Sequence, residues 1–104
     1  MLATRIPQFL RAVALAALLV IAGCQTAPVQ EMSDARQAIM VAREAGAEQH
    51  AATLLKAAVD YLQSAEGFLN DRRYDLARRD AISAKTNALD ALRQVEASSG
   101  AEKP

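Results

Sequence analysis

The fold of this chain is decided by residues 61–84, YLQSAEGFLNDRRYDLARRDAISA. On both sides of Asn70 and Asp71, apolar residues recur every three or four positions, which is the spacing of an amphipathic helix. The two stripes differ in phase, and each extends beyond the quoted stretch. Before the break the stripe contains Leu55, Ala58, Leu62, Ala65 and Leu69, and after it Ala77, Ala81, Ala84, Ala88, Ala91 and Val95.

The phase change favours a turn over one continuous helix. If the first stripe continued past Leu69, it would place Arg72 and Arg79 on the apolar seam, where a charge is costly to bury. Asparagine and aspartate favour turns because their side chains bond to nearby backbone. We therefore predict a tight antiparallel turn over 70–73. A single long rod stays open as an alternative, since no glycine or proline enforces the turn.

A third helical stripe precedes these two and contains Met32, Ala35, Ile39, Ala42 and Gly46. Ser33 and Asp71 are candidate N-caps, and Gly46 suits a left-handed helix end. The prediction is an all-α protein, a small alanine-rich antiparallel three-helix bundle over 31–97. Alanine side chains bury little area each, so we expect a marginally stable monomer or burial of an aromatic flank against a partner.

The N-terminal segment has the parts of a secretory signal. Arg5 and Arg11 precede an uninterrupted apolar run from Ala12 to Ala22, which at eleven residues is too short for a bilayer that needs about 20. The run ends in Ile21-Ala22-Gly23-Cys24, with the only cysteine of the chain as the last of these residues. The alternative is a buried apolar helix that contains this cysteine by chance.

This ending resembles the lipobox of bacterial lipoproteins, in which a signal peptidase recognises the small residues before the cysteine. The resemblance implies a signal peptide over 1–23 and a covalent diacylglycerol and N-acyl lipid on Cys24, with no other cofactor. Two or three acyl chains would hold the protein firmly at a membrane. Residues 24–30 would form a tether and 98–104 a flexible tail. In such lipoproteins an aspartate directly after the cysteine retains the protein at the inner membrane. Residue 25 is glutamine, so the resemblance favours the periplasmic face of the outer membrane over the inner membrane.

Composition argues against several functions. Without residues 1–23, ten lysines and arginines face twelve acidic residues, so no basic excess indicates nucleic acid. His50 has no partners at a metal-ligand spacing, and the glycines are too scattered for a phosphate loop. No serine is paired with a general base in a recognisable pattern. We therefore expect a noncatalytic protein without a metal.

Two groups of residues are candidate partner contacts. Leu54, Tyr61 and Phe68, seven positions apart, could meet a partner, or they could cover the third helix within the same domain. The second group could bind an acidic partner, a lipopolysaccharide phosphate or a peptidoglycan carboxylate, or be a solvated helix start interleaved with aspartates. It consists of Arg72, Arg73, Arg78 and Arg79.

Two further resemblances concern the helical part. The stretch from Tyr61 to Ala84 resembles one tetratricopeptide-type helical hairpin, although a single unit cannot form a solenoid. Most of the chain from Met32 to Val95 is similar to the bacterial family called domain of unknown function 4398. The matching positions are mostly alanines, among them Ala35, Ala42, Ala58, Ala65, Ala77, Ala81, Ala84 and Ala88. Members of that family are small lipoproteins or envelope proteins, some joined to OmpA-like domains.

These observations favour a lipid-anchored helical adaptor that binds another envelope protein, possibly OmpA-like. The alternative is a structural lipoprotein of the alanine-zipper type, which associates with peptidoglycan through a C-terminal lysine. Here the chain ends in Lys103-Pro104, and the heptad pattern breaks near residue 70. An enzyme or enzyme inhibitor has no positive signal, and self-association is left open.

Overall fold

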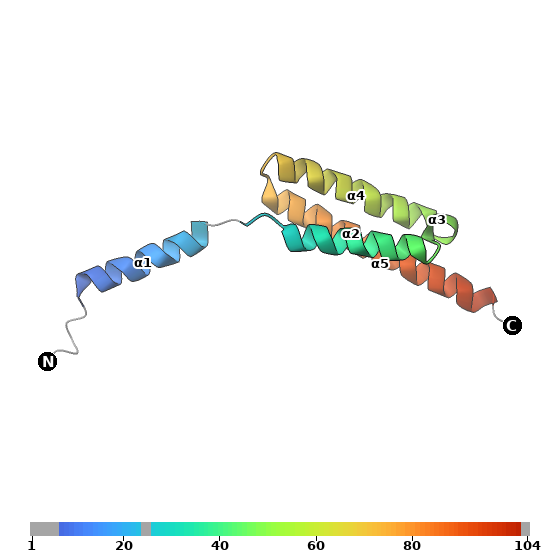
Figure 1. The fold of residues 1–104 in the computed structure, drawn as a ribbon, viewed down its shortest axis with the longest axis horizontal. Coiled ribbons are helices and arrows are strands. Elements are labelled where there is room, and N and C mark those ends of the chain that lie inside the picture. Colours follow the sequence, from blue (N-terminus) through green and yellow to red (C-terminus); the bar gives the residue numbers. More distant parts are fainter. Residues whose placement is uncertain (1–6, 24–25, 103–104) are drawn as a thin grey trace.

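The computed structural model describes residues 7–23 and 26–102, and the regular structure in these ranges is entirely helical (Figure 1). The all-α prediction is therefore confirmed. The helices are α1 (Gln8–Gly23), α2 (Val29–Glu44), α3 (Ala47–His50), α4 (Ala52–Asn70) and α5 (Tyr74–Glu102).

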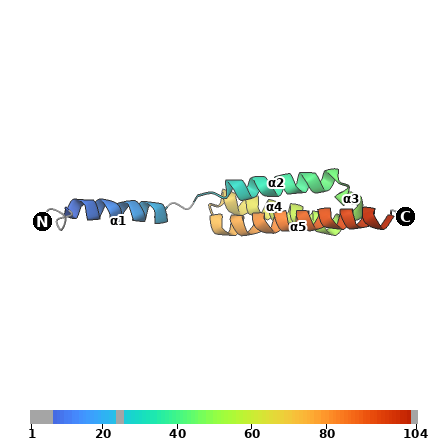
Figure 2. The ribbon, with the colours of Figure 1, turned by 90° about the horizontal axis from the view of Figure 1, so that it is seen from below.

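Helices α2, α4 and α5 lie side by side along their length, with neighbours in the chain running in opposite directions (Figures 1 and 2). Helix α5 is central to this bundle because its contacts with α4 and with α2 are the most extensive between helices of the described ranges. Within the described ranges, α1 contacts none of the other helices. No described helix is both long enough and apolar enough to cross a membrane.

The core is built around a column of alanines on α5. Ala77, Ala81, Ala84, Ala88 and Ala91 have no exposed surface, and Val95 continues the column with 4% exposed. These are the positions of the predicted stripe. Because alanine has only a methyl group, neighbouring helices can approach to the short end of the usual 8–10 Å axial separation.

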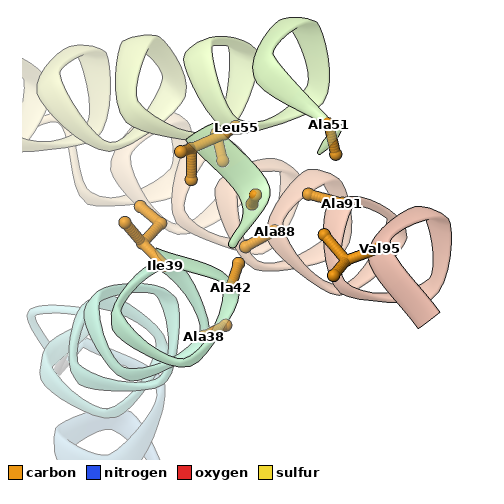
Figure 3. Packing of buried hydrophobic residues seen from close by; sticks show 10 residues of the cluster. Ala38, Ile39, Ala42, Ala51, Leu55, Ala88, Ala91 and Val95 are labelled. Atoms are coloured by element: carbon orange, nitrogen blue, oxygen red, sulfur yellow. The ribbon is translucent and has the colours of Figure 1, made fainter. Parts of the chain in front are cut away.

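The larger core side chains come from the helices that face this column. They form two clusters. One lies around Ile39 and Leu55 toward the α3 end (Figure 3), and the other lies around Met32 toward the α4–α5 turn. The predicted stripes of the other two helices are thus largely confirmed. Their buried members are Met32, Ala35, Ile39 and Ala42 on α2, and Leu55, Ala58 and Ala65 on α4.

The predicted turn between α4 and α5 is present, and it has the hydrogen bonds of a Schellman motif. The N–H of Arg73 donates to the Phe68 carbonyl at 2.8 Å, and the N–H of Arg72 donates to the Leu69 carbonyl at 3.0 Å. The prediction of Asp71 as an N-cap is wrong. Asp71 closes α4 instead, since its N–H donates to the Gly67 carbonyl at 3.2 Å.

Arg72 occupies the left-handed position of this motif, with φ 59°. This conformation costs an L-residue with a Cβ roughly 1–2 kcal/mol, which glycine avoids. We therefore expect Arg72→Gly to raise the free energy of unfolding by about 0.5–1 kcal/mol in urea denaturation followed by circular dichroism. Arg73→Gly is the matched control, and it should not stabilise the protein. A destabilising Arg72→Gly would contradict the assigned turn.

Helix boundaries differ from the prediction at both ends of the bundle. Ser33 is not an N-cap, because α2 already begins at Val29, after Pro28 with φ −78°. The N–H of Met32 donates to the Pro28 carbonyl at 3.0 Å, so the helical hydrogen bonds already begin at this residue. At the other end, α5 continues to Glu102 and so includes residues 98–102 of the predicted tail. A single glycine, Gly100, costs a helix only about 1 kcal/mol.

The link between α2 and α4 contains a short helix that the stripes did not indicate. Gly46 has φ 102°, and its N–H donates to the Arg43 carbonyl at 3.0 Å, so its predicted role in ending the first bundle helix is confirmed. The single turn α3 follows directly. Ala47, the first residue of α3, and Ala51, which follows the helix, are both buried. The core therefore continues through the connection between α2 and α4.

Candidate functional site

An open groove of about 460 Å³ lies between α4 and α5. Its α4 side consists of residues three and four positions apart, which therefore share one face of the helix. We call this feature the α4–α5 groove. It is lined by Ala57, Asp60, Tyr61, Ser64 and Phe68 of α4 and by Arg79 and Asp80 of α5.

A buried carboxylate lies at the α5 side of this groove. Asp80 carries a charge but is only 4% exposed, because it lies within the alanine-rich interface. Ser64 Oγ donates a hydrogen bond to one carboxylate oxygen at 2.6 Å, and Arg79 Nε donates to the other at 3.2 Å. A buried charge needs such partners to offset its lost hydration. Asp80 therefore joins the two helices through a polar contact.

The two aromatic residues of α4 give the groove its apolar character. Tyr61 is 41% exposed, and Phe68 is half-buried with the guanidinium of Arg73 5.4 Å from its ring centroid. Leu54, the third member of the predicted flank, does not line the groove. It packs against the cluster around Leu55 instead. The structure thus brings Tyr61 and Phe68 together and assigns Leu54 to the bundle core.

The four predicted arginines do not form one site. Arg79 lies at the groove, Arg73 stands over Phe68, and Arg72 is exposed in the turn. Arg78 points elsewhere and binds the segment before α2. A single anion-binding cluster made of all four is therefore absent from the described residues.

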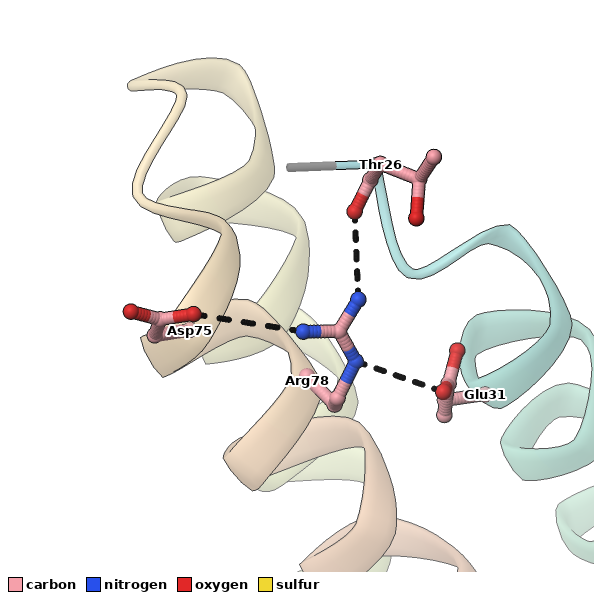
Figure 4. A network of polar contacts seen from close by, with 4 residues as sticks. All are labelled: Thr26, Glu31, Asp75 and Arg78. Carbon is pink, nitrogen blue, oxygen red and sulfur yellow. Dashed lines mark hydrogen bonds and ion pairs between the residues drawn. The ribbon is translucent and has the colours of Figure 1, made fainter. Parts of the chain in front are cut away.

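Arg78 connects three segments of the chain (Figure 4). Its Nε lies 3.3 Å from a carboxylate oxygen of Glu31 on α2, and a terminal nitrogen lies 3.9 Å from Asp75 on α5. The other terminal nitrogen donates to the backbone carbonyl of Thr26 at 3.1 Å. We call this contact the Arg78 clamp. It holds residue 26, which belongs to the predicted tether of residues 24–30, against the bundle.

Loss of the clamp should loosen the segment before α2. We expect Arg78→Gln to lower the free energy of unfolding by about 1 kcal/mol, since its contacts are charge-assisted but partly exposed. Amide hydrogen exchange at residues 26–31 should become faster. Arg93→Gln is the matched control, because among the described residues the exposed Arg93 pairs only with Asp90 of its own helix. Unchanged exchange at residues 26–31 in Arg78→Gln would contradict the clamp.

The residues of the predicted lipobox are only partly within the structure. Ile21, Ala22 and Gly23 are the last residues of α1. Cys24, the predicted lipidation site, lies outside the described residues.

The groove combines the apolar rings of Tyr61 and Phe68 with the charged side chains of Arg79 and Asp80. In the described ranges, no three His, Cys, Asp or Glu side chains are grouped so that they could hold a metal ion. His50 is exposed at the end of α3. Sequence reasoning missed Asp80 because it was counted among solvated charges. Its spacing of three and four from Ala77 and Ala84 was the available signal.

The described residues thus form a small alanine-rich helical bundle with an open groove between α4 and α5. The family described as Domain of unknown function (DUF4398) matches residues 30–103, a range that contains the bundle almost completely. The chain belongs to this family. No curated protein and no solved structure matches it.

Proposed function

We propose that the protein is a noncatalytic envelope lipoprotein, anchored by lipid on Cys24, that acts as a helical adaptor for another envelope protein. The Arg78 clamp is the observation that carries this proposal. Thr26 follows Cys24 by two residues, and Arg78 binds its carbonyl at 3.1 Å. The bundle is therefore attached directly behind the proposed anchor, so that lipid on Cys24 would hold the whole domain at the membrane.

The proposed anchor explains two features of the N-terminal segment. Helix α1 has 16 residues with Arg11 as its only charged residue, and within the described ranges it contacts no other helix. This independence suits a signal peptide that is removed before Cys24. The proposed location is the periplasmic face of the outer membrane, because Gln25 stands where an inner-membrane signal has aspartate.

The proposed adaptor surface is the α4–α5 groove. Exposed aromatic side chains beside a polar group are typical of protein docking surfaces. Tyr61 and Phe68 can receive the apolar face of a partner helix, and Arg79 is 63% exposed at the rim. An OmpA-like envelope protein is the partner class that the family resemblance favours.

The alanine-zipper alternative receives less support. A trimeric zipper needs an alanine stripe that faces other copies of the chain. Here the column on α5, including Ala84 and Ala88, has no exposed surface and is covered by α2 and α4. The adaptor is therefore the favoured proposal.

Removal of the cysteine should stop both lipid attachment and signal-peptide removal. We expect Cys24→Ala to carry no lipid and to keep residues 1–23, because the acyl chains are attached to this thiol and cleavage follows the attachment. Fatty-acid labelling and the larger mass on an immunoblot measure this. Gln25→Ala keeps the cysteine and should be labelled and cleaved like the wild type. A Cys24→Ala protein that is labelled and cleaved like the wild type would count against the lipid anchor.

The adaptor role can be tested by photo-crosslinking in intact cells. A photoreactive phenylalanine analogue at Tyr61 should capture one reproducible envelope protein, identified by mass spectrometry. The same analogue at Ile82 is the control, because Ile82 is 50% exposed on α5 but does not line the groove. Equal capture from both positions, or none from Tyr61, would overturn the proposed adaptor surface.

A further inference from the structure

One end of the bundle carries both the segment before α2 and the α4–α5 turn (Figures 1 and 2). Thr26 is bound there by Arg78, which lies four residues after the start of α5 at Tyr74. Ala27 and Pro28 then lead into α2 at the same end. We call the residues 70–74 of the turn, together with 26–28, the basal surface.

The position of the proposed anchor determines what this surface faces. Two residues of extended chain span at most about 7 Å, so Thr26 cannot lie farther than that from a lipidated Cys24. The acyl chains on Cys24 would be in the bilayer, and the headgroups would surround the cysteine itself. The Arg78 clamp then brings the basal surface within reach of these headgroups.

The side chains of the basal surface suit phosphate groups. Arg72 and Arg73 are exposed, and in the described part of the chain neither of them forms an ion pair. Both line an open hollow of about 440 Å³ together with Tyr74, Asp75 and Leu76. Arginine binds phosphate through two parallel N–H donors.

Acidic residues are also present at this end, but their side chains are shorter than those of the arginines. A carboxylate oxygen of Asp75 lies 3.9 Å from a terminal nitrogen of Arg78, and Asp71 follows the last residue of α4. An arginine side chain is several bonds longer than an aspartate side chain, so guanidinium groups extend farther from the backbone. The guanidinium of Arg72, exposed in the turn, can therefore extend beyond these carboxylates, and that of Arg73 can do so when it leaves the ring of Phe68.

We propose that the basal surface is a membrane contact, in which Arg72 and Arg73 bind phospholipid headgroup phosphates of the leaflet that holds the anchor. This inference rests on the proposed lipid anchor at Cys24. It adds an orientation, because the bundle then stands on the membrane with α3 at its far end. Helix α4, with 19 residues at 1.5 Å each, separates the two ends by about 28 Å.

The orientation can be measured with the full-length protein, processed in its bacterial host and reconstituted in vesicles. Cys24 is the only cysteine, so once it is lipidated an introduced cysteine is the only free thiol. Asn70→Cys places a fluorophore on the basal surface, and Gln49→Cys places it on α3. The vesicles contain phosphatidylglycerol and phosphatidylcholine, with a nitroxide quencher on the headgroups. We expect quenching at residue 70 to exceed that at residue 49 several-fold.

Charge removal tests the arginines themselves. A basic side chain near an anionic membrane contributes about a fivefold bias, so the double variant Arg72→Gln/Arg73→Gln should reduce the ratio of upright to other orientations by roughly 30-fold. High salt, or vesicles of phosphatidylcholine alone, should act in the same direction. The double variant Arg43→Gln/Arg93→Gln removes the same charge from exposed positions outside the basal surface, and it should leave the quenching ratio unchanged.

The outcomes separate this inference from the proposed anchor. Mass spectrometry of the reconstituted protein first reports whether Cys24 is acylated, and an unacylated protein would overturn both. If Cys24 is acylated but residues 49 and 70 are quenched equally, the membrane contact is wrong and the anchor stands. The membrane contact is also wrong, and the anchor stands, if Arg72→Gln/Arg73→Gln does not change the quenching ratio in vesicles that contain phosphatidylglycerol. A quenching ratio that is lost in this variant and kept in the control supports the contact.

Discussion

Replacing Ala88 by leucine is expected to destabilise the bundle by about 2–3 kcal/mol. Ala88 has no exposed surface and lies in the cluster that contains Ala42 and Leu55 (Figure 3). Three further carbon atoms at this position must push α5 away from its neighbours, because a close-packed core has no room for them. Urea denaturation followed by circular dichroism measures the loss.

The same substitution at an exposed alanine of α5 is the control. Ala97 lies near the end of the helix and is exposed. Ala97→Leu should change the free energy of unfolding by less than about 0.5 kcal/mol, as is usual for surface substitutions. If Ala88→Leu were tolerated as well as Ala97→Leu, the alanine column would not set the distance between the helices.

The second large effect is expected at the polar contact between α4 and α5. Ser64→Ala removes the 2.6 Å hydrogen bond to a carboxylate that remains buried, so the free energy of unfolding should fall by about 1.5–2 kcal/mol. Asp80→Ala removes the charge itself and leaves Ser64 free to bond water. That variant should be nearly neutral or stabilising. Chemical denaturation measures the free energy of unfolding of both variants.

The double variant Ser64→Ala/Asp80→Ala completes a thermodynamic cycle. Once Asp80 is absent, the loss of the serine hydroxyl should have little further effect. The coupling free energy should therefore be close to the cost of Ser64→Ala alone. Additive effects of the two substitutions would show that the hydrogen bond contributes nothing measurable.

The sequence carried most of the information about the bundle. The alanine stripe from Ala77 to Val95 has the period of a helix face, and burial of that face follows from the need to remove it from water. The turn after Asn70 was predictable because a continuous helix would have buried Arg72. Gly46 signalled the end of α2, since a left-handed residue suits glycine best.

Other features depend on tertiary contacts that no local pattern encodes. Asp80 is buried because Ser64, 16 residues earlier, lies opposite it in the hairpin. The Arg78 clamp joins residues up to 52 positions apart, so the spacing of the arginines gave no sign of it. Leu54 and Tyr61 share a heptad spacing, yet one packs on the core and the other lines the groove. Small differences in angle around a helix decide such assignments.

The lipid anchor on Cys24 is tested most directly by the intact mass of the protein isolated from its native host, with the membrane and soluble fractions analysed separately. We expect a polypeptide that begins at Cys24, with a mass increased by one diacylglycerol and one N-acyl group. A full-length chain that begins at Met1, carries no lipid and is recovered in the soluble fraction would contradict the proposed anchor, the adaptor role and the membrane contact of the basal surface.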